Sequence, residues 1–418
     1  MSNLHDRRTQ PTTRLSSHVI PSTPVQYITD RTGLEALCKT LHQSPRLALD
    51  TEFVGEESFV PRLELIQVAT EQTAAVIDFP AFRGDDSLDA FWEIVCRTDV
   101  EKIVHAGRQD LDLFAAHAGQ IPKPFFDTQI AAAMVGYGAQ VAYANLVHRL
   151  HGTKLDKAHT FTNWSARPLS REQLTYALAD VQYLLSIHEH LRGRLTKLGR
   201  LEWAHEEFAR LENVVGEKSR QPQERYQRIR GWDSLKPKAA AVLRELAAWR
   251  ETEARSRNVP RGRILRDEVL LQLARHPPKT VEELRSIRGV HPSEAERNGE
   301  QVIATIYSAL ALPSSAWPEV PRDRKPEPES TGLVELLQAV LKARAAAEGI
   351  APSLLATTGD IQTLVESTQQ RVPVDLPLLR GWRRQLVGEL FLRVLDGTML
   401  VSVDSKTGAL QVEARAES

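Results

Sequence analysis

Between Pro24 and about Val215, short runs of apolar residues alternate with segments of helical spacing. The runs include RLALD, LELIQVAT and AAVIDF, and the helical segments include SLDAFWEIVC and QDLDLFAAHAG. Short apolar runs are typical of buried strands, whereas apolar residues three and four positions apart indicate one face of a helix. Strands that alternate with helices pack in layers around a shared sheet. The sequence therefore predicts an α/β domain over this region.

The remaining chain shows mainly helical patterns. After Val215, AAAVLRELAAWRETEARSRN repeats apolar residues at helical spacing, and GLVELLQAVLKARAAAEG does so again further on. Between them, PSSAWPEVPRDRKPEPES is rich in proline and charge and cannot bury a core. We therefore expect a flexible arm, an α/β domain, a helical domain, a linker, a second helical domain and a tail, over residues 1–24, 25–215, 226–312, 313–330, 331–403 and 404–418.

Composition places few limits on function. The chain has 418 residues, 42% of them hydrophobic and 26% charged, as in an ordinary globular protein with two or three domains. A net charge of −1 gives no general attraction to nucleic acid, so binding surfaces must be sought locally. Cys38 and Cys96 are too few for a disulfide framework, which favours a reducing cytoplasm. The sequence shows no apolar leader segment and no run near 18 apolar residues, so neither secretion nor membrane insertion is expected.

Two acidic residues interrupt the strand expected within LALDTEFVGEES. Side chains alternate along a strand, so Asp50 and Glu52 share one face, roughly 7 Å apart, and Thr51 points to the other. Two carboxylates in that arrangement repel each other unless a positive charge lies between them. A divalent cation could supply this positive charge. An isolated Asp-x-Glu, however, more often lies at a strand end in water or pairs with an arginine.

Three further residues can complete such a site. In KIVHAGRQDLDLF a strand ends and a helix begins, so Asp110 is expected in the first helical turn, where a capping role alone would explain it. RPLSREQLTYALADVQYLLSIHEHL is expected to form one amphipathic helix that begins with the capping-box residues Ser170 and Gln173. Tyr176 and Asp180 lie one turn apart on that helix. Because apolar residues share their face, Asp180 is expected to be partly buried and to need a positive partner.

Four carboxylates on three segments, with a tyrosine one turn before the last, resemble the motifs of the ribonuclease D family, in the tyrosine branch of the DEDD exonuclease superfamily. The motifs are LDTEF, HAGRQDLDLF and YALADVQYL, and the connecting segments SFVPRLELIQVA, FFDTQIAAAMVGYG and NWSARPLSREQLTYA are similar too. This resemblance covers roughly Pro24 to Glu212. The segment LRELAAWRETEARSRNVPRGRILRDEVLLQLA resembles an HRDC domain, and LLRGWRRQLVGELFLRVLDG more loosely resembles a second one.

The resemblance implies a ribonuclease H-like exonuclease domain with a mixed sheet, followed by two small all-α HRDC-like domains. It implies a cytoplasmic hydrolase that trims 3′ ends of structured RNA, such as tRNA precursors, and releases nucleoside 5′-monophosphates. Neither a membrane nor an obligate protein partner is implied. Oxygen ligands favour Mg²⁺ or Mn²⁺. By analogy, Asp50 bridges two such ions, and Glu52 and Asp180 complete the site on the nucleophile side. Asp110 holds the other ion through water, and Tyr176 orients the attacking water.

His105 and Asp110 also have the His-x4-Asp spacing found in the histidine branch of the same superfamily. In that assignment the middle aspartate would be one of four others: Asp78, Asp85, Asp86 or Asp89. Tyr176 and Asp180 would then have no role, and Thr175 occupies the position where a histidine would precede Asp180. The tyrosine assignment is therefore preferred. We expect His105 at a strand end, near the 3′ nucleotide.

Local charge indicates where RNA could bind. Between Lys218 and Arg266 there are fourteen Lys or Arg against five Asp or Glu. Five arginines without an intervening acid form what we call the basic cluster: Arg255, Arg257, Arg261, Arg263 and Arg266. A solvated helix end would explain such a cluster, but beside a nuclease domain we expect it to bind phosphates. Two alternatives stay open, a 3′-5′ exonuclease that acts on DNA and a non-catalytic RNA-binding protein.

Overall fold

The computed structural model describes residues 26–55, 58–84, 86–155, 162–217, 222–320 and 328–415. The arm expected at residues 1–24 lies outside these ranges. Contacts divide the chain into two compact units. The first unit comprises Met1–Glu52, Glu64–Asn213 and Pro326–Ser418, and the second comprises Phe53–Leu63 and Val214–Lys325.

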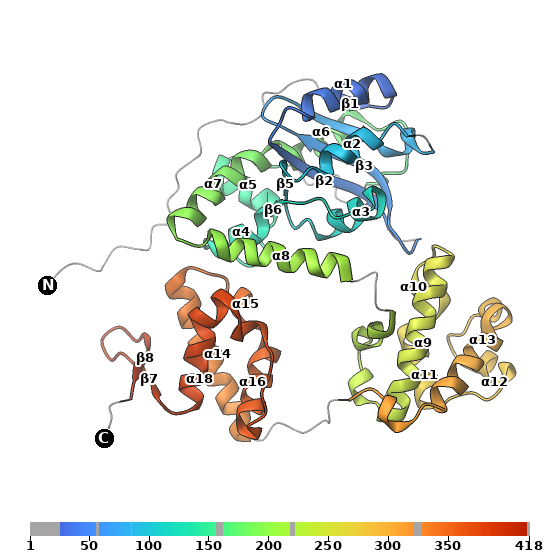
Figure 1. Ribbon diagram of the computed structural model, residues 1–418, viewed down its shortest axis with the longest axis vertical. Helices are drawn as coiled ribbons and strands as arrows, with labels where there is room; N and C mark the ends of the chain where they lie inside the picture. Colours follow the sequence, from blue (N-terminus) through green and yellow to red (C-terminus); the bar gives the residue numbers. More distant parts are fainter. Residues whose placement is uncertain are drawn as a thin grey trace. The chain divides into compact units, whose positions relative to one another are not determined.

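A six-stranded mixed sheet forms the centre of the first unit (Figure 1), in the order β1-β4-β3-β2-β5-β6. β3 and β4 are antiparallel, whereas β1 pairs with β4, β2 with β5 and β5 with β6 in parallel. The strands are β1 (Gln26–Ile28), β2 (Arg46–Val54), β3 (Arg62–Ala69), β4 (Ala74–Asp78), β5 (Glu101–Val104) and β6 (Phe125–Asp127). Inside the sheet, Leu47, Ala48 and Leu49 of β2 are fully buried. The predicted α/β fold with a mixed sheet is confirmed.

The helices of this sheet domain have clear end signals. Asp127 caps α4, Ser170 forms the predicted capping box of α6, and Gly119 and Gly152 end α3 and α5 in the left-handed conformation. The helices are α1 (Arg31–Leu41), η1 (Phe79–Phe82), α2 (Asp89–Cys96), α3 (Arg108–Ala118), α4 (Thr128–Met134), α5 (Tyr143–His151), α6 (Arg171–Gln182), α7 (Leu184–Lys197) and α8 (Leu201–Glu217). The single helix expected from Arg171 onward is therefore two helices, separated at Tyr183.

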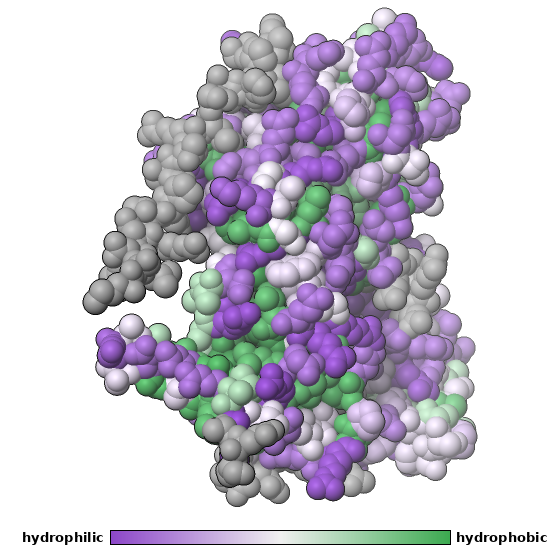
Figure 2. Space-filling view, turned by 60° about the vertical axis from the view of Figure 1, so that its left-hand side comes forward, coloured by the Kyte–Doolittle hydropathy of each residue, from purple (hydrophilic) through white to green (hydrophobic). Residues whose placement is uncertain are grey.

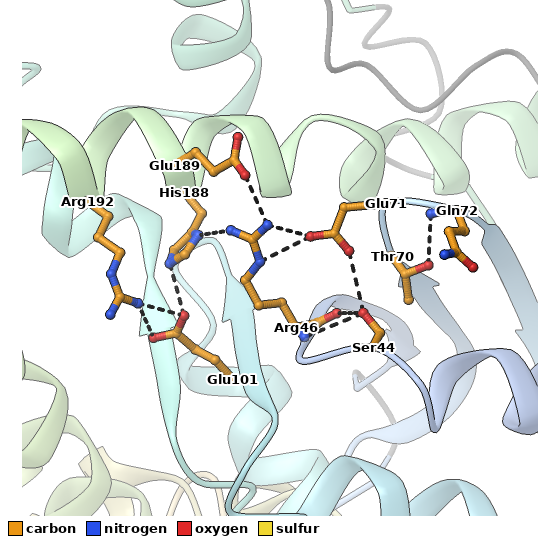
Figure 3. A network of polar contacts seen from close by, with 9 residues as sticks. All are labelled: Ser44, Arg46, Thr70, Glu71, Gln72, Glu101, His188, Glu189 and Arg192. Carbon is orange, nitrogen blue, oxygen red and sulfur yellow. Dashed lines mark hydrogen bonds and ion pairs between the residues drawn. The ribbon is translucent and has the colours of Figure 1, made fainter.

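A network of ion pairs joins α7 to the starts of β2 and β5 (Figure 3). Arg46 and Glu101 are direct neighbours in the β2–β5 register. Arg46 lies 2.9 Å from the carboxylate of Glu189, while Glu101 lies 3.1 Å from His188 Nε2 and 3.0 Å from Arg192 Nη1. Because α7 follows α6 directly, the network also limits how far the end of α6 can move relative to these strands.

The second unit is helical. Its elements are η2 (Pro222–Arg228), η3 (Trp232–Ser234), α9 (Pro237–Ser256), α10 (Arg261–Ile264), α11 (Asp267–Arg275), α12 (Val281–Ser286), α13 (Pro292–Leu310) and η4 (Ser314–Ala316). Residues of α9, α11 and α13, among them Leu243, Leu270 and Ile306, share one buried core. The loop that follows β2 belongs to this unit: Phe59 packs against the same core, and the Val60 N–H donates to Asn258 Oδ1 at 3.2 Å.

The C-terminal segment of the first unit packs against α8. Trp382 stacks on Trp203 of α8, with ring centroids 5.3 Å apart and an interplanar angle of 12°. Beside this stack, Arg383 forms a buried ion pair with Glu207, at 2.6 Å for Nη2 to Oε2. The elements are α14 (Pro328–Glu348), α15 (Pro352–Leu355), α16 (Thr358–Gln370), η5 (Pro377–Leu379), α17 (Gly381–Arg383), η6 (Arg384–Gly388), α18 (Glu389–Leu395), β7 (Met399–Val403) and β8 (Leu410–Ala414).

The end of the chain differs from the tail expected over residues 404–418. It forms a hairpin in which Val401 opposes Val412 and Val403 opposes Leu410. β8 alternates apolar and polar residues, whereas the first three residues of β7 are all apolar. Figure 2 shows hydrophobic residues gathered on the face that the view brings forward. In the hairpin, Leu400 and Val403 are exposed apolar residues. Within the described ranges, no helix has both the length and the apolar character needed to cross a bilayer.

Candidate active site

Asp50 and Glu52 project from β2, between β3 and β5. Burial raises the pKa of Asp50 well above its usual value, and the charges of Asp110, Asp180 and Glu52 raise it further. Burial likewise raises the pKa of Glu52 to about 8, with Asp180 and Asp110 adding to the shift. The structure therefore brings the four predicted carboxylates, which we call the carboxylate cluster, within electrostatic range of one another.

Asp110 lies in the first turn of α3, as predicted, and only 7% of it is exposed. Thr51 Oγ1 donates a short hydrogen bond to Asp110 Oδ1. Burial raises the pKa of Asp110 to about 6, although the Thr51 hydrogen bond acts in the opposite direction. Thr51 was expected to point away from Asp50 and Glu52. Because its hydroxyl reaches Asp110 on the neighbouring helix, it belongs to the site as well.

The turn that leads into α3 is tightly held. Ala106 has a positive φ of 54°, and a Cβ on Gly107 would lie 2.4 Å from Val104 Cγ2. The Asp127 carboxylate accepts hydrogen bonds from the N–H groups of Ala106, at 3.1 Å, and Gly107, at 3.0 Å. It also caps α4 through Gln129 N at 2.8 Å. Asp127 thus joins the start of α3 to the start of α4, a role that the sequence did not reveal.

Tyr176 and Asp180 lie on α6, one turn apart. Both are half-buried. The Tyr176 ring is 6.1 Å from that of the buried Trp164 and tilted by 32°. Burial raises the pKa of Asp180 to about 7, and the charge of Asp110 adds to it. Asp180 thus joins the carboxylate cluster from a third element, α6.

The donor set of the carboxylate cluster fits divalent cations. Four partly or fully buried carboxylates repel one another, and a hard cation with oxygen ligands would offset that repulsion. In the described part of the chain, no three His, Cys, Asp or Glu side chains are close enough together to enclose an ion as they stand. Metal binding by Asp50, Glu52, Asp110 and Asp180 is therefore a proposal.

His105 directly follows the end of β5, as expected, but both of its ring nitrogens have protein neighbours. Nδ1 lies 2.9 Å from Thr128 Oγ1, and Nε2 lies 3.0 Å from the Val141 carbonyl oxygen. Burial lowers the pKa of the imidazole. Contact with a nucleotide would require one of these bonds to be replaced, so the structure gives the predicted role of His105 no support.

The basic cluster divides into paired and exposed arginines. Arg257 contacts Glu294 at 2.8 Å and Arg261 contacts Glu251 at 2.5 Å. The Arg261 guanidinium also lies 4.3 Å from the centre of the Phe59 ring, and that of Arg255 lies 5.4 Å from it. The other two members, Arg263 and Arg266, are exposed. Two arginines of the basic cluster are thus held in ion pairs, and phosphate binding by the cluster stays a prediction.

Comparisons with known proteins identify relatives of the chain. Residues 25–196 match the family model of a 3′-5′ exonuclease, and residues 239–306 match that of an HRDC domain. The chain is 39% identical over 386 residues to ribonuclease D of Granulibacter bethesdensis, covering 91% of this chain and 94% of that protein. It is 40% identical over 379 residues to ribonuclease D of Zymomonas mobilis, covering 90% and 95%.

The fold is also shared with a solved structure. The crystal structure of Escherichia coli ribonuclease D, described as an exoribonuclease involved in structured RNA processing, superposes with a TM-score of 0.79 at 30% identity. The match covers 90% of this chain and 99% of that one. Fold, carboxylates and matches together define a 3′-5′ exonuclease that carries an HRDC domain.

The chain belongs to the ribonuclease D family. It is accordingly a 3′-5′ exoribonuclease, and exonucleases of this class typically depend on metal ions. The resemblance seen in the sequence is confirmed.

Proposed function

We propose that this exoribonuclease trims the 3′ ends of structured RNA, such as tRNA precursors, and releases nucleoside 5′-monophosphates. We further propose that the carboxylate cluster holds two Mg²⁺ or Mn²⁺ ions for this reaction. The observation that carries the proposal is the convergence of four acids from β2, α3 and α6. The pKa of each is raised by burial, with neighbouring carboxylates adding to the shift. Such a set is stable in its charged form only beside cations.

Each side chain has a distinct part in this scheme. When bound, two divalent ions activate the attacking water and stabilise the leaving 3′ oxygen. Asp50, at the centre of the cluster, would contact both ions, and Glu52 and Asp180 would complete the position on the nucleophile side. Asp110, which accepts a hydrogen bond from Thr51, would help to hold the other ion. The Tyr176 hydroxyl would orient the attacking water by a hydrogen bond.

The proposed substrate has two kinds of support. The solved relative from Escherichia coli acts in structured RNA processing, and the HRDC-containing unit presents exposed arginines, including Arg263 and Arg266, that can bind phosphates in folded RNA. Phosphate contacts do not distinguish one base from another, so substrate choice would depend on a free 3′ end and on RNA shape.

The test uses the purified protein with Mn²⁺ and a tRNA that carries a 3′ extension. We expect stepwise loss of the extension and release of nucleoside 5′-monophosphates. A blocked 3′ end should prevent the reaction, and DNA of the same sequence should be degraded more slowly. Asp50→Asn should lower the rate by about a thousandfold or more because a shared ligand is lost. Asp30→Asn is the control, since Asp30 caps α1 and asparagine caps equally well. Cleavage of the blocked RNA, or full activity of Asp50→Asn, would contradict the proposal.

A further inference from the structure

The helix that carries Asp180 ends abruptly. α6 ends at Gln182 and α7 begins at Leu184, while Tyr183 between them has φ −106° and ψ −6° rather than helical values. In a continuous α-helix, the N–H of Tyr183 would donate to the carbonyl oxygen of Ala179, four residues earlier. These two groups flank Asp180.

The side chain of Tyr143, the first residue of α5, stands between these two backbone groups. Its hydroxyl oxygen accepts the N–H of Tyr183 at 3.2 Å, which also bonds to the Val181 carbonyl oxygen, and its hydroxyl donates to the carbonyl oxygen of Ala179 at 3.1 Å. A side chain inserted into the helical hydrogen-bond ladder is a recognised cause of a sharp bend. The separation of α6 from α7 therefore has a physical cause in a residue far from both in sequence.

Tyr143 is itself well supported. Its ring centroid lies 5.5 Å from that of His105, whose nitrogens are engaged by Thr128 and Val141. Burial raises the pKa of the Tyr143 phenol well above its usual value, and the charge of Asp180 raises it further. The hydroxyl consequently keeps its proton and remains able to donate to the Ala179 carbonyl.

We propose that Tyr143 is a positioning residue that directs Asp180 toward the metal ions. By bridging Ala179 and Tyr183, its hydroxyl fixes the backbone on both sides of Asp180 and thus the direction of the Asp180 carboxylate. This inference rests on the proposed function, because it assumes that Asp180 is a metal ligand. It also gives His105 a role, since the imidazole supports the Tyr143 ring.

Tyr143→Phe tests the inference because it keeps the ring and removes only the bridging hydroxyl. The N–H of Tyr183 can then bond directly to the Ala179 carbonyl, so the thermal midpoint should stay near that of the wild type. The Mn²⁺ dissociation constant, measured by electron paramagnetic resonance without RNA, should rise about 10- to 100-fold, as is typical when a residue that orients a metal ligand is changed. The kcat should fall by a similar factor, while KM for RNA stays nearly constant.

Tyr137→Phe is the matched control. The hydroxyl of Tyr137 bonds to His190 at 2.9 Å and to Arg194 at 3.3 Å, both side chains of α7, without touching the backbone beside Asp180. This variant should bind Mn²⁺ like the wild type. Unchanged Mn²⁺ affinity in Tyr143→Phe, or an equal loss in Tyr137→Phe, would overturn the positioning role of Tyr143 alone. If Asp50→Asn binds Mn²⁺ as the wild type does, the proposed metal site fails, and this inference fails with it.

Discussion

Burial and neighbouring carboxylates raise the pKa values of Glu52, Asp180 and Asp110 to about 8, 7 and 6. In the unfolded chain the pKa values of such acids lie near 4. The folded protein therefore binds these protons more tightly than the unfolded chain does. The associated stability is fully present below about pH 4 and is lost as pH rises through the interval from 6 to 8. Cations bound by the carboxylate cluster should reverse this loss.

Glu52→Gln tests this linkage. In the presence of a chelator, the free energy of unfolding of the wild type should fall between pH 5 and pH 9 relative to that of the variant, because glutamine cannot ionise. Adding Mn²⁺ should stabilise the wild type more at pH 8 than at pH 6. Urea unfolding at several pH values measures both effects. Parallel pH profiles for the two proteins would show that neither burial nor the neighbouring carboxylates raise the pKa of Glu52 in the folded protein.

Tyr176 on α6 could act through its hydroxyl or only through the packing of its ring, and the Tyr176→Phe variant distinguishes these roles. If its hydroxyl orients the attacking water, Tyr176→Phe should lower kcat about 10- to 1000-fold at similar KM, with unchanged Mn²⁺ affinity. If the ring only packs beside Trp164, phenylalanine should replace it with little kinetic effect. Steady-state kinetics together with a thermal midpoint distinguish these cases. Wild-type turnover would require another group to orient the water.

The acids proposed for the site can be singled out in the sequence because their residue types and local patterns are unusual. Asp50 and Glu52 stand out in an apolar strand, and Asp180 stands out on an amphipathic face. Thr51 and Tyr143 carry no such signal. Strand alternation pointed Thr51 away from its neighbours, and Tyr143 meets the backbone around Asp180 only through tertiary packing.

The β5–α3 turn shows how a short segment fixes a functional side chain. Gly107 is the N-cap of α3, and any Cβ there would overlap Val104. Gly107→Ala should destabilise the protein by roughly 1–3 kcal/mol, as overpacking does, and should reduce activity by displacing Asp110. Chemical denaturation and exonuclease rates measure the two effects.

Gly193 provides the control for this substitution. It lies within α7, where an added Cβ meets no other atom within 4 Å. Gly193→Ala should therefore stabilise the helix by up to about 1 kcal/mol and leave activity unchanged. If Gly107→Ala proves as harmless as Gly193→Ala, the turn is less constrained than its geometry indicates.

Helix ends that are marked by local sequence signals were predicted correctly, whereas features that depend on contacts distant in sequence were not. The capping box at Ser170 correctly marked the start of α6, but the break at Tyr183 coincides with hydrogen bonds to the Tyr143 hydroxyl, which belongs to another helix. The β7–β8 hairpin was missed for a different reason. Each strand has only five residues, and β7 opens with three consecutive apolar residues directly after a long helical region, so only β8 carries the alternation typical of a strand.

Removal of the helical regions would be a poor test of RNA binding. Truncation after Val215 would also remove Trp382 and Arg383, which cover Trp203 and pair with Glu207 on α8. Truncation would expose the apolar surface around Trp203 that this segment covers, so any loss of activity could reflect misfolding or aggregation. Substitutions at exposed positions of the intact chain avoid this problem.

The double variant Arg263→Ala/Arg266→Ala tests whether the basic cluster binds RNA. Both side chains are exposed, so their loss should leave the thermal midpoint unchanged. If each contacts a phosphate, affinity for tRNA-sized RNA should fall, and the slope of log K against log salt should decrease by about one to two. Turnover of short oligonucleotides should not change.

Two control variants show whether a change in the salt slope is specific to Arg263 and Arg266. Arg393→Ala/Lys406→Ala also removes two exposed positive charges but lies in the C-terminal segment, so an equal change of slope there would indicate a general charge effect. Arg257→Ala should instead lower stability, because Arg257 is paired with Glu294 and Glu253. Binding isotherms at several salt concentrations supply the slopes. An unchanged slope in Arg263→Ala/Arg266→Ala would show that RNA contacts other cations of the chain.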